Sequence, residues 1–144
     1  MKKKTMLSLT ALALLLMGTP TSTFAHGPDS DHHHAYEEIH AEKIKEMLDS
    51  EENVVILDAR TKDYDDGNRL PGAKFLPYNS SDEEVEAAAP SKESTIIIYC
   101  TSPKCPASKF LAERMATMGY TNLLKYPEGI NDWVQKGYPV EHAN

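Results

Sequence analysis

The sequence is poor in several features that would identify a large class of proteins. Its 144 residues include only two cysteines and one tryptophan, and 15 basic side chains are outnumbered by 22 acidic ones. This negative balance argues against nucleic acid or an anionic membrane as the main partner, because both recruit basic surfaces. After residue 18 no apolar run approaches the ~20 residues that a membrane-spanning helix needs. No internal repeat is visible.

The first 25 residues have the pattern of a secretory signal peptide. A basic start, Met1–Lys4, precedes a largely apolar stretch of 13 residues, Met6–Gly18, and Thr23–Ala25 offers small residues for cleavage. We expect cleavage after Ala25 and export to a periplasm or the medium, with an uncleaved signal anchor as the alternative. The signal holds three lysines and no acid, so the mature chain has 119 residues and a net charge of −10. That length is enough for one domain.

Residues 26–35 are expected to form a flexible arm, because they are polar and lack apolar periodicity. After cleavage, the free amine and imidazole of His26 would form a chelating pair suited to Cu(II) or Ni(II). His32, His33 and His34 would add weak ligands nearby. Exposed histidine clusters also bind metals adventitiously, so a functional metal site is only one of two interpretations.

Residues 36–144 are expected to form one α/β domain, because apolar runs alternate with amphipathic segments. Three consecutive isoleucines, Ile96–Ile98, are typical of a strand buried on both faces of a parallel sheet. Further extended segments are expected at 54–58, 74–77 and 123–126, and helices at 36–49, 80–89, 108–118 and 130–136. Together these predict a sandwich with a mostly parallel central sheet flanked by helices. Trp133 is expected in the core with its indole N–H paired.

The segment between the isoleucine strand and the helix at Ser108 contains both cysteines. A thiol placed there meets a helix start and unpaired backbone N–H groups, which favour a thiolate. Ligands of open α/β sheets bind beyond the carboxyl ends of the strands, where Asp58 and Arg60 would also lie. We therefore predict Cys100 as a nucleophile. The predicted anion-binding residues of its loop are Thr101, Ser102, Lys104, Ala107 and Ser108.

Several motifs, taken in order, resemble those of the rhodanese-like domains. They are Asp58–Arg60 with Asp63–Tyr64, Gly67–Ala73, Tyr99–Cys100, Gly119–Tyr120, Glu128–Trp133 and Gly137–Val140. The resemblance covers about residues 36–140 and implies a three-layer α/β sandwich without a cofactor. It also implies sulfur transfer: the loop cysteine takes the outer sulfur of a small sulfur-donor anion, carries it as a persulfide and passes it to a thiol acceptor. We expect such a protein to be a monomer.

The loop departs from the family pattern at Cys105, where family members usually carry an arginine that helps to bind an anionic donor. Lys104 is the only cation of this loop, and it is a point charge rather than a bidentate fork. Arg60 or Arg69 could compensate from neighbouring loops. A preference for thiosulfate is therefore left open.

Cys105 has three interpretations. It could resolve a persulfide on Cys100, close a protective or redox-active disulfide with it, or be a small buried apolar residue. After export both thiols would lie in an oxidising compartment, so a disulfide and a guarded reactive thiol are both plausible. The alternatives to a sulfurtransferase are accordingly a thiol–disulfide redox or sensor protein and a non-catalytic binding module.

Two residues near the loop have both a structural and a chemical interpretation. Asp58 is expected chiefly to accept N–H bonds from neighbouring turns, although it could orient the loop or act as a general acid or base. Arg60 could bind the substrate anion or form an ordinary surface ion pair.

Overall fold

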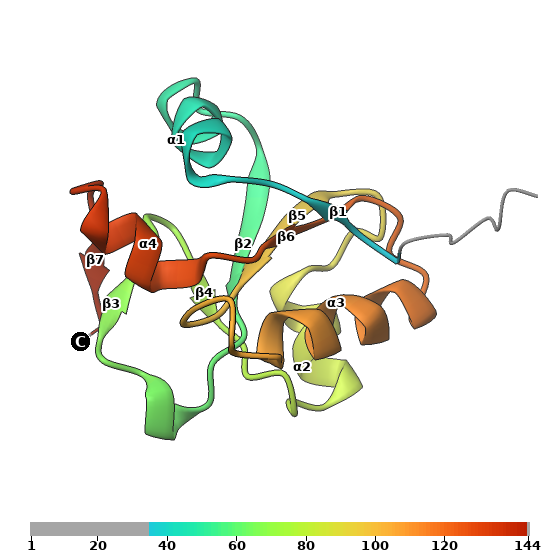
Figure 1. Ribbon diagram of the computed structural model, residues 1–144. Coiled ribbons are helices and arrows are strands. Elements are labelled where there is room, and N and C mark those ends of the chain that lie inside the picture. The colour runs from blue at the N-terminus through green and yellow to red at the C-terminus, as the bar shows by residue number, and fades with distance from the viewer. Residues whose placement is uncertain (1–34, 144) are drawn as a thin grey trace, which may run out of the picture. The chain divides into compact units, whose positions relative to one another are not determined.

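The computed structural model describes residues 35–143 (Figure 1). The predicted signal peptide and nearly all of the predicted arm, including its four histidines, lie outside the described residues. Within residues 35–143, no helix combines the length and the hydrophobicity needed to cross a bilayer.

A five-stranded parallel sheet forms the middle layer of the domain, with strand order β1-β6-β5-β2-β4. The strands are β1 (Glu37–Glu38), β2 (Val54–Asp58), β4 (Lys74–Phe75), β5 (Thr95–Tyr99) and β6 (Leu123–Tyr126). The central strand β5 pairs with β2 from Val54↔Thr95 to Asp58↔Tyr99. Because the strands are parallel, β2 and β5 end at the same edge of the sheet.

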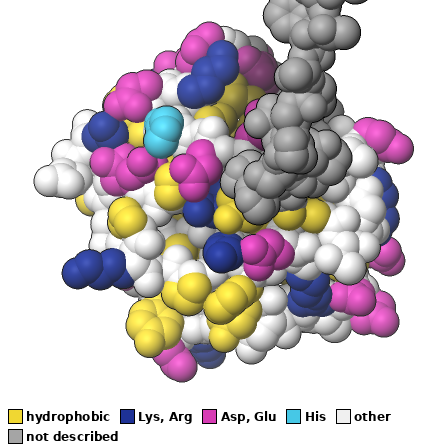
Figure 2. All heavy atoms as spheres, turned by 45° about the vertical axis from the view of Figure 1, so that its right-hand side comes forward, with side chains coloured by type: hydrophobic (Ala, Val, Ile, Leu, Met, Phe, Trp, Pro, Cys, Tyr) yellow, Lys and Arg dark blue, Asp and Glu magenta, His cyan; other side chains and the backbone are white. Residues whose placement is uncertain are grey.

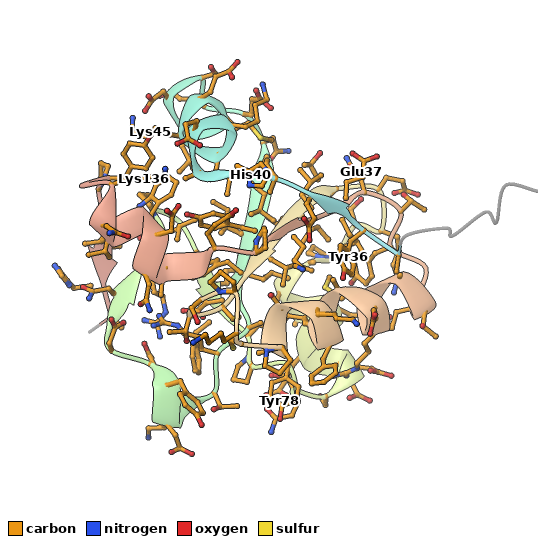
Figure 3. The ribbon with its side chains drawn as sticks, in the orientation of Figure 1. Tyr36, Glu37, His40, Lys45, Tyr78 and Lys136 are labelled. Carbon is orange, nitrogen blue, oxygen red and sulfur yellow. The ribbon has the colours of Figure 1, made fainter. Side chains whose placement is uncertain are left out.

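Helices cover both faces of the sheet, as Figure 1 shows. They are α1 (Ala41–Asp49), α2 (Asp82–Ala88), α3 (Ala107–Thr117) and α4 (Gly129–Gln135), with a 3₁₀ turn at Lys62–Tyr64 and a small antiparallel pair of β3 (Asn68–Arg69) and β7 (Glu141–His142). Lys136, at the end of α4, reaches α1 and pairs with Glu42 at 2.8 Å (Figure 3).

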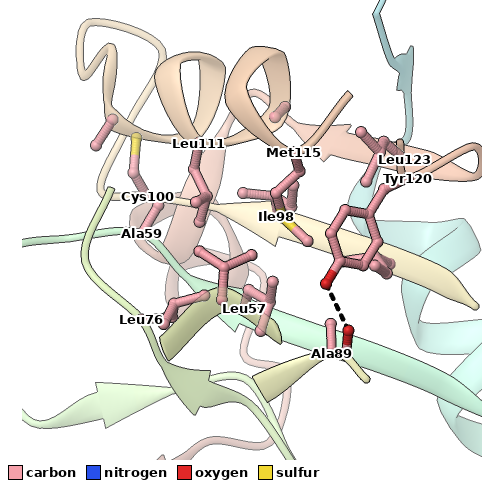
Figure 4. Packing of buried hydrophobic residues seen from close by; sticks show 14 residues of the cluster. Leu57, Ala59, Leu76, Ala89, Ile98, Cys100, Leu111, Met115, Tyr120 and Leu123 are labelled. Atoms are coloured by element: carbon pink, nitrogen blue, oxygen red, sulfur yellow. Dashed lines mark hydrogen bonds between the residues drawn. The ribbon is translucent and has the colours of Figure 1, made fainter. Parts of the chain in front are cut away.

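The side chains of β5 alternate between the two faces, which divides the core in two. Ile96 and Ile98 pack with Leu111 and Met115 of α3 in one cluster (Figure 4). Ile97 and Tyr99 join the other cluster, with α1 and α4. A strand that is apolar on both faces therefore connects two helical layers, which confirms the predicted three-layer sandwich.

Trp133 of α4 is fully buried, and its indole N–H donates to the carbonyl oxygen of Pro139 at 2.7 Å. The predicted core role with a paired N–H is confirmed.

The outer surface of the domain is mixed in character. One face shows charged side chains of both signs interspersed, with hydrophobic side chains gathered along its lower part (Figure 2).

The helix predicted at 36–49 begins later than expected. Glu37 and Glu38 instead form β1, paired with Leu124 and Lys125 of β6, and the Ile39 N–H donates to the Lys125 carbonyl at 2.9 Å. The exposed edge of β6 offers these backbone groups hydrogen bonds at once, so strand pairing overrides local helix propensity. The helix starts at Ala41.

Candidate functional site

The loop that follows β5 is held in place by the start of α4. The N–H groups of Ile130 and Asn131 donate to the carbonyl oxygens of Cys100 and Thr101, at 2.9 and 3.1 Å. Gly129 has a φ of +71°, and a Cβ there would lie 2.4 Å from the Cys100 oxygen. A residue without a side chain is therefore required for the loop and the helix to approach this closely.

At its other end the loop turns into α3. The Cys105 N–H donates to the Ser102 carbonyl at 3.0 Å, and α3 starts at Ala107, directly after Pro106. The missing N–H of a proline costs little at a helix start, where an amide would have no helical partner. The loop backbone is thus hydrogen-bonded on both sides of its turn.

Cys100 is fully buried beneath this loop, and Figure 4 shows its side chain directed towards α3. Its thiol donates to the carbonyl oxygen of Cys105 at 3.2 Å and lies 3.8 Å from that of Ser102, while the Ser108 hydroxyl donates to the sulfur at 3.6 Å. Burial raises the pKa of the Cys100 thiol, and the N–H and hydroxyl of Ser108 oppose that rise only in part. Two carbonyl oxygens beside the sulfur favour the protonated thiol.

Cys105 has different surroundings. Its side chain is partly exposed, and both cysteines are free thiols. Burial works against the thiolate, but the Cys100 thiol and the N–H groups of Ala107 and Thr101 outweigh it and lower the pKa of Cys105. Most thiolate-stabilising donors therefore gather around Cys105, whereas the sequence led us to expect them around Cys100. The third interpretation of Cys105, as a small buried apolar residue, stays open, because the side chain is only partly buried and packs against the core cluster that contains Cys100.

A cavity of about 450 Å³ opens in front of the loop. Its walls include Cys105 and four of the predicted loop residues, but not Cys100. The lining residues are Arg60, Thr61, Tyr64, Tyr78, Thr101, Ser102, Lys104, Cys105, Pro106, Ala107 and Phe110. Ser108, the fifth predicted loop residue, is buried against Cys100 instead.

Three aromatic residues of the cavity were not predicted from the sequence. Tyr64, Tyr78 and Phe110 are all substantially exposed, and the rings of Tyr78 and Phe110 lie 5.8 Å apart. Figure 3 shows Tyr78 on the outer side of the domain. The three residues come from separate segments, and Phe110 lies away from the buried side of α3, so no local pattern in the sequence could have brought them together.

Arg60 borders the cavity but is held by a buried polar network. Its guanidinium donates to Asp58 (2.8 Å), to Asp66 (2.8 Å) and to the carbonyl oxygens of Tyr64 (3.3 Å) and Asn68 (2.6 Å), so all five N–H groups are engaged. Burial disfavours the charge, but the bonds with Asp58 and Asp66 raise the pKa of Arg60 above its usual value.

This network bears on the interpretations of Asp58 and Arg60. Asp58, fully buried, accepts the backbone N–H of Arg60 at 3.1 Å and the Tyr99 hydroxyl at 3.2 Å, in keeping with the expected structural role. Of the two interpretations of Arg60, the surface ion pair is wrong, because the side chain is 1% exposed, and binding of a substrate anion stays a prediction. Arg69 bonds to Asp65 and stacks over Phe75, and it is not part of the cavity lining.

No cluster of three or more potential metal ligands occurs within the described range, 35–143. The predicted metal-binding histidines of the arm lie outside that range.

Similarity to known proteins agrees with this fold. The chain is 28% identical over 99 residues to the "Putative sulfur carrier protein YrkF" of Bacillus subtilis; the match covers 69% of this chain and about half (51%) of that protein. The BH2092 protein of Bacillus halodurans superposes with a TM-score of 0.66 at 25% identity, over 75% of this chain and 77% of that one.

A thiosulfate sulfurtransferase of Pseudomonas aeruginosa has a TM-score of 0.64 at 22% identity, over 76% of this chain and 21% of that one, a likeness that concerns the fold alone. The sequence profile described as "Rhodanese-like domain" matches residues 40–136. The chain belongs to the rhodanese-like domain family.

Proposed function

We propose that the protein is a sulfurtransferase that carries sulfane sulfur as a persulfide on Cys100 and passes it to a thiol acceptor. The observation that carries the proposal is the pair of free thiols in one loop, with Cys100 bonded to the Cys105 backbone and Cys105 facing a cavity. Family membership and a relative named as a sulfur carrier support sulfur chemistry at these thiols.

The surroundings of Cys100 suit storage of a bound sulfur. A persulfide is easily oxidised or reduced when exposed, and full burial of the Cys100 side chain protects it from both. The hydroxyl and N–H of Ser108 supply donors for the negative charge of the persulfide. Release then requires a thiol acceptor that reaches the loop through the cavity.

The cavity favours an organic persulfide over thiosulfate as the donor. Arg60 has all its donors engaged, and Lys104 is the remaining cation of the lining. The walls offer the rings of Tyr64, Tyr78 and Phe110, and a volume of about 450 Å³ lies in the usual range for small organic ligands. A larger organic donor, whose carbon chain can contact these rings, matches the walls better than a small doubly charged oxyanion.

Thr101 supports the same placement of the donor. It lines the cavity, and its hydroxyl, which forms no hydrogen bond of ordinary geometry within residues 35–143, is one of the groups that lower the pKa of Cys105. A sulfur anion bound at Cys105 that accepts a full hydrogen bond from this hydroxyl would be stabilised.

Thiol–disulfide exchange is the second candidate function. The thiol of Cys100 points at the Cys105 backbone at 3.2 Å, so the loop already holds the two cysteines in contact. Formation of a disulfide from these two free thiols requires an oxidant.

Mass spectrometry of the intact reduced protein tests the proposal. After mixing with glutathione persulfide, polysulfide or thiosulfate, we expect a gain of about 32 Da, one sulfur atom, which a thiol acceptor then removes. The Cys100→Ser/Cys105→Ser double variant is the control and should gain nothing. If none of the three donors adds sulfur to the wild type, the proposal is wrong; a loss of about 2 Da instead would favour disulfide exchange.

A further inference from the structure

The two thiols of the loop are not equally accessible. Cys100 is fully buried and is not part of the cavity lining, whereas Cys105 is partly exposed and forms part of the wall. A sulfur donor in the cavity therefore meets the Cys105 sulfur first. The proposed function places the stored sulfur on Cys100, so the sulfur needs a route from the cavity to a buried thiol.

We propose that Cys105 is the thiol that takes sulfur from the donor, and that it relays this sulfur inward to Cys100. The inference rests on the proposed sulfurtransferase function and assigns the order in which the two cysteines act. It makes Cys105 a catalytic residue rather than a thiol that only resolves a finished persulfide.

The first step is a displacement at the sulfane sulfur of the donor. The Cys105 thiolate attacks the outer sulfur of an organic persulfide, R–S–SH. A bond forms between the Cys105 sulfur and that outer sulfur, and the R–S bond breaks. The electron pair and negative charge leave with the thiolate R–S⁻, which gives Cys105–S–SH without any external oxidant or reductant. Lys104, in the same wall, lies on the path of the anion.

The second step moves the same sulfur atom inward. The Cys100 thiol loses its proton to water, and the resulting thiolate attacks the outer sulfur of Cys105–S–SH. That bond forms as the bond between the Cys105 sulfur and the outer sulfur breaks, and Cys105 leaves as a thiolate with the electron pair of the broken bond. The products are Cys100–S–SH, Cys105–S⁻ and one proton in water, so the step conserves atoms, electrons and charge.

The loop favours this direction of transfer. A thiol with the lower pKa leaves faster, and the amides of Thr101 and Ala107 lower the pKa of Cys105. The loop backbone is anchored by the bonds from α4 to Cys100 and Thr101 and by the bond from Cys105 to Ser102. This anchoring holds the Cys100 sulfur against the Cys105 backbone, 3.2 Å from its carbonyl oxygen. Proximity fixed in advance lowers the entropic cost of the relay.

The sequence makes the order of the two steps measurable. Lys104 stands between the cysteines, so trypsin cleaves there and places Cys100 in peptide 93–104 and Cys105 in peptide 105–109. The full reduced chain is mixed with glutathione persulfide, quenched with an alkylating reagent after increasing times, digested and analysed by mass spectrometry. In the wild type we expect the extra sulfur on 105–109 first and on 93–104 later.

Two matched serine variants separate the steps. Cys100→Ser should accumulate the sulfur on Cys105, because the relay has no acceptor. Cys105→Ser should load Cys100 about tenfold more slowly or worse, because the donor must reach a buried thiol. Equal urea midpoints for the two variants and the wild type would exclude unfolding as the cause.

The relay is overturned if Cys105→Ser loads Cys100 at the wild-type rate, or if the wild type gains sulfur on Cys100 while Cys100→Ser gains none. The proposed function fails in a different way, since the wild type would then gain no sulfur on either peptide with any donor. If the extra sulfur appears on the Cys100 peptide before the Cys105 peptide in the wild type, the relay is wrong, but the proposed sulfurtransferase function is not contradicted.

Discussion

Two neighbouring strands of the sheet, β2 and β5, end side by side in very different polar environments. Beyond β2, Asp58 and Arg60 are buried with every guanidinium N–H engaged. Beyond β5, the Cys100 sulfur has only weak sulfur contacts, with two carbonyl oxygens and the Ser108 hydroxyl, and Cys105 faces an open cavity. The first environment is electrostatically satisfied, and the second keeps reactive atoms available.

The difference shows that polar groups at one edge of a sheet can have separate roles, one in stability and the other in reactivity. A buried ion pair with complete hydrogen bonding fixes the backbone that borders the cavity, but it offers nothing to a ligand. Thiols with few strong partners do little for stability and remain free to react. Variants that act on one environment should therefore leave the other largely unchanged.

Arg60→Ala should have the largest effect, and that effect should be on stability. It removes the closer of the two cations beside the buried Asp58 and leaves only Arg69, at 3.6 Å, and breaking such a buried pair costs about 3–5 kcal/mol. Urea denaturation followed by circular dichroism measures the loss. Lys43→Ala is the control, because its pair with Glu46 is exposed and should contribute about 1 kcal/mol or less. Equal losses for the two variants would show that the network beyond β2 does not stabilise the fold.

Gly129→Ala should have the next largest effect and should reach the second environment as well. The residue has a positive φ, and its new Cβ would collide with the Cys100 carbonyl, so we expect a loss of about 3 kcal/mol. Gly137→Ala is the control that separates the steric collision from the cost of the positive φ. Its φ is +70°, but no atom lies within 4 Å of the added Cβ. That control should lose only about 1 kcal/mol.

The two glycine variants should also differ in thiol chemistry. Gly129→Ala displaces the Cys100 carbonyl and should change the alkylation rates of the cysteines, whereas Gly137→Ala should keep the wild-type rates. Equal stabilities and equal rates for the two variants would contradict the close contact between α4 and the loop.

Ser108→Ala should have the smallest effect, confined to one thiol. Because only a thiolate is alkylated rapidly, the rates follow each pKa: Cys105, with its lowered pKa, should react at lower pH than Cys100, whose pKa is raised. Removing the Ser108 hydroxyl should raise the pKa of Cys100 further and slow its alkylation about fivefold, equivalent to about 1 kcal/mol.

The Cys105 rate serves as the internal reference for this measurement, and it should not change in Ser108→Ala. If Cys100 is alkylated at lower pH than Cys105 in the wild type, the assignment of the more acidic thiol is wrong.

The elements of the core could be predicted from the sequence because their signals are local. The apolar runs at 54–58 and 123–126 coincide with β2 and β6, and the isoleucine run lies within β5. Such runs can be satisfied only by burial on both faces. β1 was missed, because two glutamates form a strand only when the edge of β6 is available to pair with them.

The candidate site could be predicted in part. Chain order places Cys100 and Asp58 at one edge of the sheet, but it does not reveal which thiol faces outwards. The hydrogen bonds of Arg60 include two to the backbone carbonyl oxygens of Tyr64 and Asn68, which follow it in the chain. The cavity brings together three aromatic residues from separate segments of the sequence. These features arise from tertiary packing, and side-chain type alone cannot show them.

The bond between α4 and the loop has a practical consequence. Trp133 is the only tryptophan of the chain and lies in the same short helix as Gly129 and Ile130, which touch and bond the Cys100 backbone. The protein therefore carries a native fluorophore one helical turn from the contact with the loop that holds both cysteines. Its emission can be followed in real time, without a label, to test the proposed loading and discharge of that loop.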